Sequence, residues 1–221
     1  MELWKQKAPA VRRELYYYDT SDGFEAARLA ARLYSMLKEE LQRAQKEKVL
    51  FLCIGTDRST GDSLGPLIGH QLYRKGLRHI TVVGTLEYPV HAMNLEDTLY
   101  LVRERYPDHL VVAVDASVGK TCHVGCVTLG RGALRPGLGV SKNLQAVGDL
   151  FITGVVSGGS SRDPMMLQSI RLGMVMHMAE CISDSICLVE KLWESLSLVW
   201  QISQSCHGKM GSSMKEGSWN G

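Results

Sequence analysis

Two aspartates, Asp62 and Asp115, stand where a pair of carboxylates could do chemistry. Asp62 lies in a polar, glycine-bounded loop after an apolar run at 49–54, and Asp115 closes a second apolar run at 110–115. Such fully apolar runs are typical of strands in a parallel sheet, which binds ligands outside the carboxyl ends of its strands. We therefore expect both carboxylates to face one crevice, where they could share a proton, activate a water or hold a cation.

Each aspartate also has a plain structural interpretation. Asp62 precedes a predicted helix, so its carboxylate could accept a backbone N–H at the helix start. The positive end of that helix would still keep Asp62 ionised and available as a base or ligand. Asp115 could serve only to tie down the loop that follows it.

Four further polar residues fall on loops that we expect at the same edge of the sheet as candidates for substrate binding: Asp57, Ser59, Glu87 and Ser157. The first two precede Asp62, the third follows a predicted strand at 80–84, and the last begins the loop after a predicted strand at 150–156. A solvated turn or a surface acid is the simpler interpretation of each.

Other motifs favour neither a cofactor nor a metal. Gly55 and Gly61 are separated by five residues, one too many for a nucleotide phosphate loop, and Asp62 stands where that loop needs a lysine. The spacing of Cys122 and Cys126 fits no standard zinc pair. Five histidines lack a partner pattern in the sequence, so we expect them to be structural: His70, His79, His91, His109 and His177.

The remaining pattern predicts one α/β domain with a parallel sheet. Apolar residues repeat at helical spacing in several segments, with helices expected at about 22–45, 63–75, 94–105 and 165–196. Between them the strand patterns predict a βαβαβ order, with further strands at 122–129 and 150–156. We expect an N-terminal segment at 1–20, a single domain at 21–200 and a flexible tail at 201–221, because the tail is small and polar.

Composition limits the classes of partner. The 25 basic and 23 acidic residues nearly cancel, so no overall field favours nucleic acid or an anionic membrane. No stretch approaches the roughly 20 apolar residues of a membrane span. Six scattered cysteines and a first segment without an apolar core favour a reduced, cytoplasmic protein. A small molecule or a peptide remains as the partner, and the oligomeric state stays open.

The stretch from Ile54 to Pro66, IGTDRSTGDSLGP, resembles the signature of the sporulation protein YyaC family. The resemblance continues at 84–92, 114–116, 147–149 and 152–156, and covers about 47–190. That family is similar, more distantly, to the germination protease of spores and to the hydrogenase maturation peptidases. The resemblance implies a three-layer α/β/α fold of the phosphorylase/hydrolase type with a mostly parallel central sheet.

In this resemblance Asp62 and Asp115 match the two acids of the related peptidases. Those acids are thought to be catalytic in the spore protease, whereas in the hydrogenase peptidases they bind nickel with help from a histidine. We find no histidine at a matching position, so the spore protease is the better analogy. It implies a sporulation-associated peptidase without a cofactor, acting on a peptide or spore protein in the cytoplasm of the developing spore or mother cell.

Two other functions stay open on the same fold. One is a non-catalytic sporulation factor that binds a peptide or a protein in the crevice, since one fold hosts many activities. The other is metal-dependent hydrolysis, because two carboxylates with waters could hold a hard cation.

Overall fold

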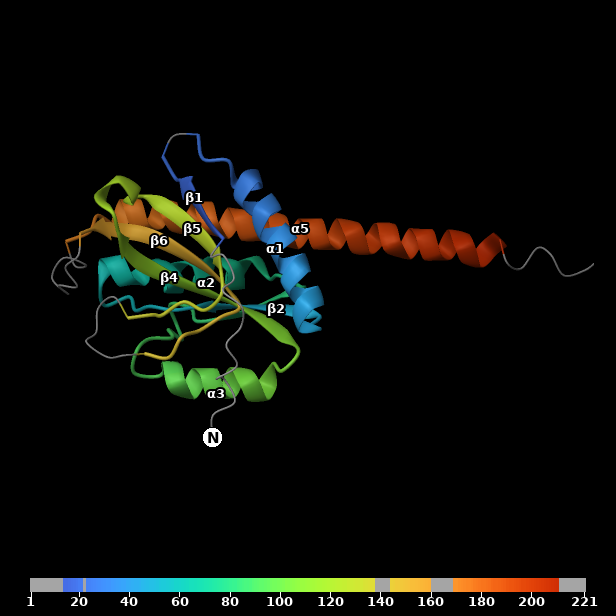
Figure 1. Cartoon of the computed structure of the whole chain (residues 1–221), viewed down its shortest axis with the longest axis horizontal. Helices are drawn as coiled ribbons and strands as arrows, with labels where there is room; N and C mark the ends of the chain where they lie inside the picture. The colour runs from blue at the N-terminus through green and yellow to red at the C-terminus, as the bar shows by residue number, and fades with distance from the viewer. Residues whose placement is uncertain (1–13, 22, 138–143, 160–168, 211–221) are drawn as a thin grey trace, which may run out of the picture.

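A computed structural model describes residues 14–21, 23–137, 144–159 and 169–210, with side chains described as far as residue 195. Its strands are β1 (Leu15–Asp19), β2 (Lys48–Cys53), β3 (Ile80–Val83), β4 (His109–Gly119), β5 (Cys126–Arg131) and β6 (Leu150–Gly158). Its helices are α1 (Ala26–Ala44), α2 (Leu64–Lys75), α3 (Leu95–Arg105) and α5 (Leu172–Met210), with short 3-10 helices at Thr60–Ser63 and Thr121–His123. The strands form one sheet in the order β1-β5-β6-β4-β2-β3 (Figure 1).

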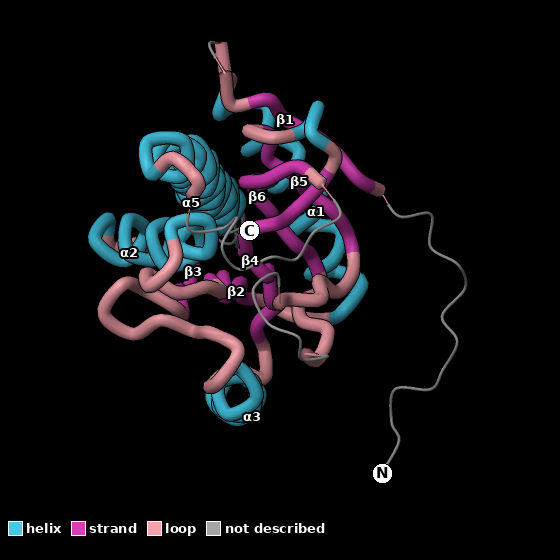
Figure 2. Tube along the Cα trace, turned by 90° about the vertical axis from the view of Figure 1, so that its left-hand side faces the viewer, coloured by secondary structure: helices cyan, strands magenta, loops and turns pink. Residues whose placement is uncertain are grey.

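The sheet lies between two layers of helices, as the predicted α/β/α fold requires. Helices α1, α2 and α5 bury one face of the sheet, where residues such as Phe51 and Val112 are fully buried. Helix α3 covers the other face, against alternate residues such as Leu50 and Leu52 (Figure 2). The strand β2 is therefore apolar at successive positions because both of its faces are buried.

The order in which the chain adds strands to the sheet reverses between β2 and β4. Strand β2 pairs in parallel with β3 on one side and with β4 on the other. The chain passes from β2 to β3 through α2 on one face, and from β3 to β4 through α3 on the other. In doubly wound sheets, ligands bind at the carboxyl ends of the two strands that flank such a switch.

Two elements in particular differ from the sequence-based expectation. Residues Leu15–Asp19 form an edge strand, antiparallel to β5, within the segment 1–20 where we expected none. Helix α5 begins at Leu172 and continues to Met210, so residues 201–210 are helical rather than part of a flexible tail. The rest of that expected tail, 211–221, lies outside the described residues, as does the start of the helix expected from 165.

One helix is long and apolar enough to cross a membrane by length and composition alone, which the sequence analysis did not anticipate. It is the window Leu172–Ser195 of α5, with a mean hydropathy of 1.4. Half of this window is buried inside the protein, where α5 packs against α1 and α2. This packing is typical of a core helix in a soluble-type α/β fold.

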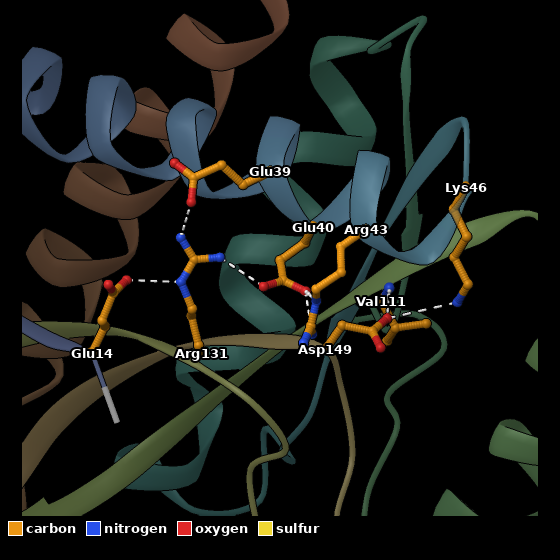
Figure 3. Close-up of polar contacts among 8 residues, drawn as sticks. All are labelled: Glu14, Glu39, Glu40, Arg43, Lys46, Val111, Arg131 and Asp149. Atoms are coloured by element: carbon orange, nitrogen blue, oxygen red, sulfur yellow. Dashed lines mark hydrogen bonds and ion pairs between the residues drawn. The ribbon is translucent and has the colours of Figure 1, made fainter. Parts of the chain in front are cut away.

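A network of charges fastens β1 and α1 to β5 (Figure 3). Arg131 of β5 donates hydrogen bonds to the carboxylates of Glu14, Glu39 and Glu40. Burial alone would lower the pKa of Arg131, but these hydrogen bonds raise it above its ordinary value. Side chains therefore hold α1 and the residue before β1 against β5, in addition to the backbone pairing of β1 with β5.

Candidate functional site

The loop that carries Asp62 is held at the end of β2 by close backbone contacts. The N–H of Gly55 donates to the carbonyl of Val90 at 2.8 Å, and the N–H of Thr56 donates to the Asp62 carbonyl at 3.0 Å. A Cβ atom at Gly55 would lie only 2.0 Å from that same Asp62 carbonyl oxygen, and the φ of Gly55 is +142°. Only glycine tolerates both conditions, so the sequence Ile54-Gly55 determines where Asp62 lies.

Two further glycines bring α2 against the ends of the strands. A Cβ at Gly65 would lie 2.0 Å from the Ile54 carbonyl oxygen, and a Cβ at Gly69 would lie 1.8 Å from the Gly84 carbonyl oxygen. The backbone of α2 therefore touches the backbone at the carboxyl ends of β2 and β3. This contact positions the turn at Thr60–Ser63, and with it Asp62, over the switch between β2 and β4.

Asp115 reaches the same place from within β4 rather than from its end. The last residue of β2, Cys53, pairs with Val114, so Asp115 lies one residue beyond the end of β2. The expectation that Asp115 closes its strand is wrong, because β4 continues to Gly119 beside β6. Val114 belongs to the core beneath α1, α2 and α5, so the alternation of side chains directs Asp115 to the α3 side.

The charge of Asp62 acts on the ionisation of Asp115. Asp115 is only 4% exposed, and burial, followed by the negative charge of Asp62, raises its pKa well above the ordinary value. The backbone N–H of Ala116, which donates to Asp115 Oδ1 at 2.8 Å, acts in the opposite direction. The structure thus brings together the two aspartates that lie far apart in the sequence.

Asp62 is less buried and remains the easier of the two to ionise. Burial raises the pKa of Asp62, while the Thr56 backbone N–H and the charge of His91 lower it. Neither the 3-10 turn nor α2 has a side-chain capping bond at its first residue, so the structure gives no support to Asp62 as a helix cap. Two like charges in a shared, partly dry site favour a state in which one proton serves both groups.

His91 is a member of the site that the sequence analysis assigned to a structural role. It follows Val90, which bridges to Ile54 beside the end of β2, and its charge acts on Asp62. The backbone N–H of Met93 donates to His91 Nδ1 at 3.3 Å, so in the neutral ring the proton resides on Nε2. Because the nearness of His91 to Asp62 depends on a long-range bridge, no local spacing in the sequence could reveal it. Among the described residues, His91 and the two aspartates do not form a close three-ligand metal cluster.

The four expected substrate-binding residues have different surroundings. Asp57 is exposed in the loop above Asp62, and the buried Oγ of Ser59 has no hydrogen-bond partner in the described part of the chain. Glu87 forms an ion pair with His70 of α2 at 3.1 Å, and this hydrogen bond lowers its pKa. Ser157 does not begin a loop, because β6 continues to Gly158 and pairs Ser157 with the end of β4.

The chain belongs to a known family. Residues 23–185 match the family described as "Protein of unknown function (DUF1256)". A Bacillus subtilis (strain 168) relative with the name "Uncharacterized protein YyaC" is 40% identical over 165 residues, which cover 75% of this chain and 80% of the relative. The chain is therefore a member of the DUF1256 family. Its similarity to YyaC agrees with the resemblance predicted from the sequence. Both aspartates and His91 lie inside the matched span.

Proposed function

We propose that the protein is a peptide-bond hydrolase in which Asp62 and Asp115 share one proton. The observation that carries this proposal is the charge of Asp62 acting on the buried Asp115, at a switch between two parallel strands. Because the pKa of Asp115 is raised further than that of Asp62, the shared proton resides on Asp115. Asp62 is then the ionised base, and Asp115 is the acid.

This assignment gives a balanced hydrolysis. Asp62 takes one proton from a water, and the oxygen of that water attacks the peptide carbonyl carbon. Asp115 gives its proton to the carbonyl oxygen as the tetrahedral intermediate forms. When the C–N bond breaks, the proton on Asp62 goes to the leaving nitrogen, and the carbonyl re-forms as it returns a proton to Asp115.

The proposed substrate is a spore protein, and the proposed location is the cytoplasm of the developing spore or the mother cell. Both rest on the likeness of the motifs around Asp62 and Asp115 to those of the spore protease. The exposed Asp57 lies in the loop next to the pair, where it is available to a bound peptide, and the Oγ of Ser59 in the same loop is buried.

The test is incubation of the purified full chain with small acid-soluble spore proteins, followed by mass analysis. We expect cleavage by the wild type and a loss of at least about 100-fold in Asp62→Asn and in Asp115→Asn, since each removes one half of the acid-base pair. Asp97→Asn, on the exposed side of α3, is the matched control and should cleave normally.

Retained cleavage in both site variants would refute the proposal. Binding of a spore protein by the wild type without any cleavage would instead favour the alternative of a non-catalytic binding factor. Cleavage that disappears with a chelator and returns with Mg²⁺ or Ca²⁺ would favour the metal-dependent alternative.

A further inference from the structure

A second cluster of ligand-type side chains lies at the opposite edge of the sheet from the aspartate pair. His79 directly precedes β3, at the amino end of that strand, and Glu190 and Glu194 lie one turn apart on α5. One ligand atom of each of the three side chains lies within 4.8 Å of the other two. Neither the proposed hydrolysis nor the packing of the core uses this arrangement.

The two oxygens of Glu190 have different surroundings. Oε1 accepts hydrogen bonds from the backbone N–H groups of Arg78 at 2.6 Å and His79 at 2.9 Å, and lies 3.1 Å from His79 Nδ1. Oε2 is buried and has no hydrogen-bond partner among the described residues, and Glu190 as a whole is only 6% exposed. A buried carboxylate oxygen without a partner is costly, so this oxygen points to a ligand that completes the site.

We propose that His79, Glu190 and Glu194 bind a divalent transition-metal cation of the Zn²⁺ type. Zinc takes imidazole nitrogen and carboxylate oxygen at about 2.0–2.2 Å in a tetrahedral arrangement, which sets neighbouring ligand atoms about 3.4 Å apart. One ligand atom from each of the three side chains already lies within 4.8 Å of the others, so rotation of the side chains can bring them to this spacing. Three protein ligands leave the fourth position to water.

The carboxylate of Glu190 suits such an ion because one of its oxygens is hydrogen-bonded to the backbone and the other has no hydrogen-bond partner among the described residues. Oε1 is held by the backbone of the turn before β3, which fixes the carboxylate, while Oε2 is available to the metal. Glu194 is exposed and approaches from the next turn of the helix. The imidazole ligand favours Zn²⁺ over Mg²⁺, which prefers oxygen ligands only.

Basic residues near the cluster act against the binding of a cation. Glu190 and Glu194 line a hollow of about 660 Å³ together with three basic residues, Lys75, Arg78 and Lys191. Lys75 is paired with Asp184 at 2.9 Å, which removes much of its repulsion. The two carboxylates of the site offset the charge of a divalent ion, so binding leaves the cluster close to neutral.

The test is calorimetric titration of the full chain with Zn²⁺ and, separately, with Mg²⁺. We expect one Zn²⁺ per chain at this site, little binding of Mg²⁺, and a Tm that rises with Zn²⁺ because only the folded state holds the site. His79→Gln and Glu194→Gln should each weaken Zn²⁺ binding by at least about 10-fold. Glu104→Gln, on the exposed face of α3, is the matched control and should bind as the wild type does.

The free cysteines of the chain are the competing zinc ligands, and the spectrum of the Co²⁺ form distinguishes them from this site. A site of one imidazole and two carboxylates gives no thiolate-to-metal charge-transfer band. Zn²⁺ affinity that is unchanged in both variants, an absence of binding, or a thiolate band would each overturn the proposal. Thermal unfolding without metal shows that the variants are folded, and spore-protein cleavage, measured in parallel, tests the aspartate pair independently.

Discussion

Asp115 is a carboxyl group buried almost completely, and this burial has a cost that depends on pH. Its raised pKa means that the folded state holds the proton of Asp115 more tightly than the unfolded state does. The native protein therefore gains from this group below the ordinary pKa near 3.8 and loses that gain as the pH rises towards the folded-state pKa.

From this we predict that Asp115→Asn stabilises the protein at neutral pH while it abolishes the proposed activity. The amide keeps an oxygen for the Ala116 N–H but does not ionise. The gain in free energy of unfolding should be on the order of 1 kcal/mol at pH 7 and should shrink towards pH 4. Denaturant unfolding of the two proteins across this range measures the difference. An advantage that grows as the pH falls would contradict it.

Among single residues, the sequence predicted the aspartate pair but not its neighbour. The convergence of Asp62 and Asp115 follows from the rule for parallel strands, which needs only the order of the elements. The role of His91 depends on the bridge between Ile54 and Val90, which lies outside the regular strands and leaves no periodic pattern.

At the scale of elements, α2 shows how a helix can be placed by residues that disfavour helices. Gly65 and Gly69 lie inside α2, where alanine would be preferred by helix propensity alone. Each faces a backbone carbonyl of the sheet at a distance that excludes any side chain. The glycines therefore lower the intrinsic stability of the helix, and they allow a short distance between the helix and the sheet.

We predict opposite effects for two glycine-to-alanine changes. Gly69→Ala should lower the free energy of unfolding by about 3 kcal/mol, because its Cβ would lie 1.8 Å from the Gly84 carbonyl oxygen. Gly173→Ala, near the start of α5 with no atom within 4 Å of its Cβ, should raise it by about 0.5 kcal/mol. Urea unfolding of both variants provides the comparison, and a stabilised Gly69→Ala would disprove the close approach.

The sequence predicted the central elements well because their patterns are local. The apolar run of β2 and the helix ending at Gly76 both have signals within a few residues. Strand β1 was missed although its tyrosines have high strand propensity, since β5, its partner in the described sheet, lies more than a hundred residues further along the chain. The extension of β4 past Asp115 was missed because its residues, Ala-Ser-Val-Gly, do not continue the run of large apolar residues, and the pairing with β6 makes them a strand.

At the scale of the whole molecule, α5 completes the layer of helices that it forms with α1 and α2 on one face of the sheet. Its buried residues include Val175, Ile182 and Val189, which belong to the same core as α1 and α2. Further along, Trp193 packs against Tyr34 of α1, with the ring centroids 5.5 Å apart. Figure 1 shows the remainder of α5 extending away from the body of the protein.

We predict that the fold tolerates loss of the end of this helix but not of its middle. A chain ending after Ser195 keeps all the contacts described above, and its free energy of unfolding should change by less than about 1 kcal/mol. A chain ending after Glu180 loses Ile182, Ile186 and Val189 from the core, at about 2–5 kcal/mol for each such side chain, and should not fold. Circular dichroism and chemical unfolding of the two truncated chains test this, and a folded shorter chain would contradict it.

The pairing of Leu15 with Gly130 also has a consequence for how the chain is made. During translation β1 leaves the ribosome before the other strands of the sheet, yet β5, its neighbour in the described sheet, follows more than a hundred residues later, and β5 in turn pairs with β6. Closing so long a loop is entropically costly and slow. The earliest strand of this sheet to be synthesised is thus among the last to pair.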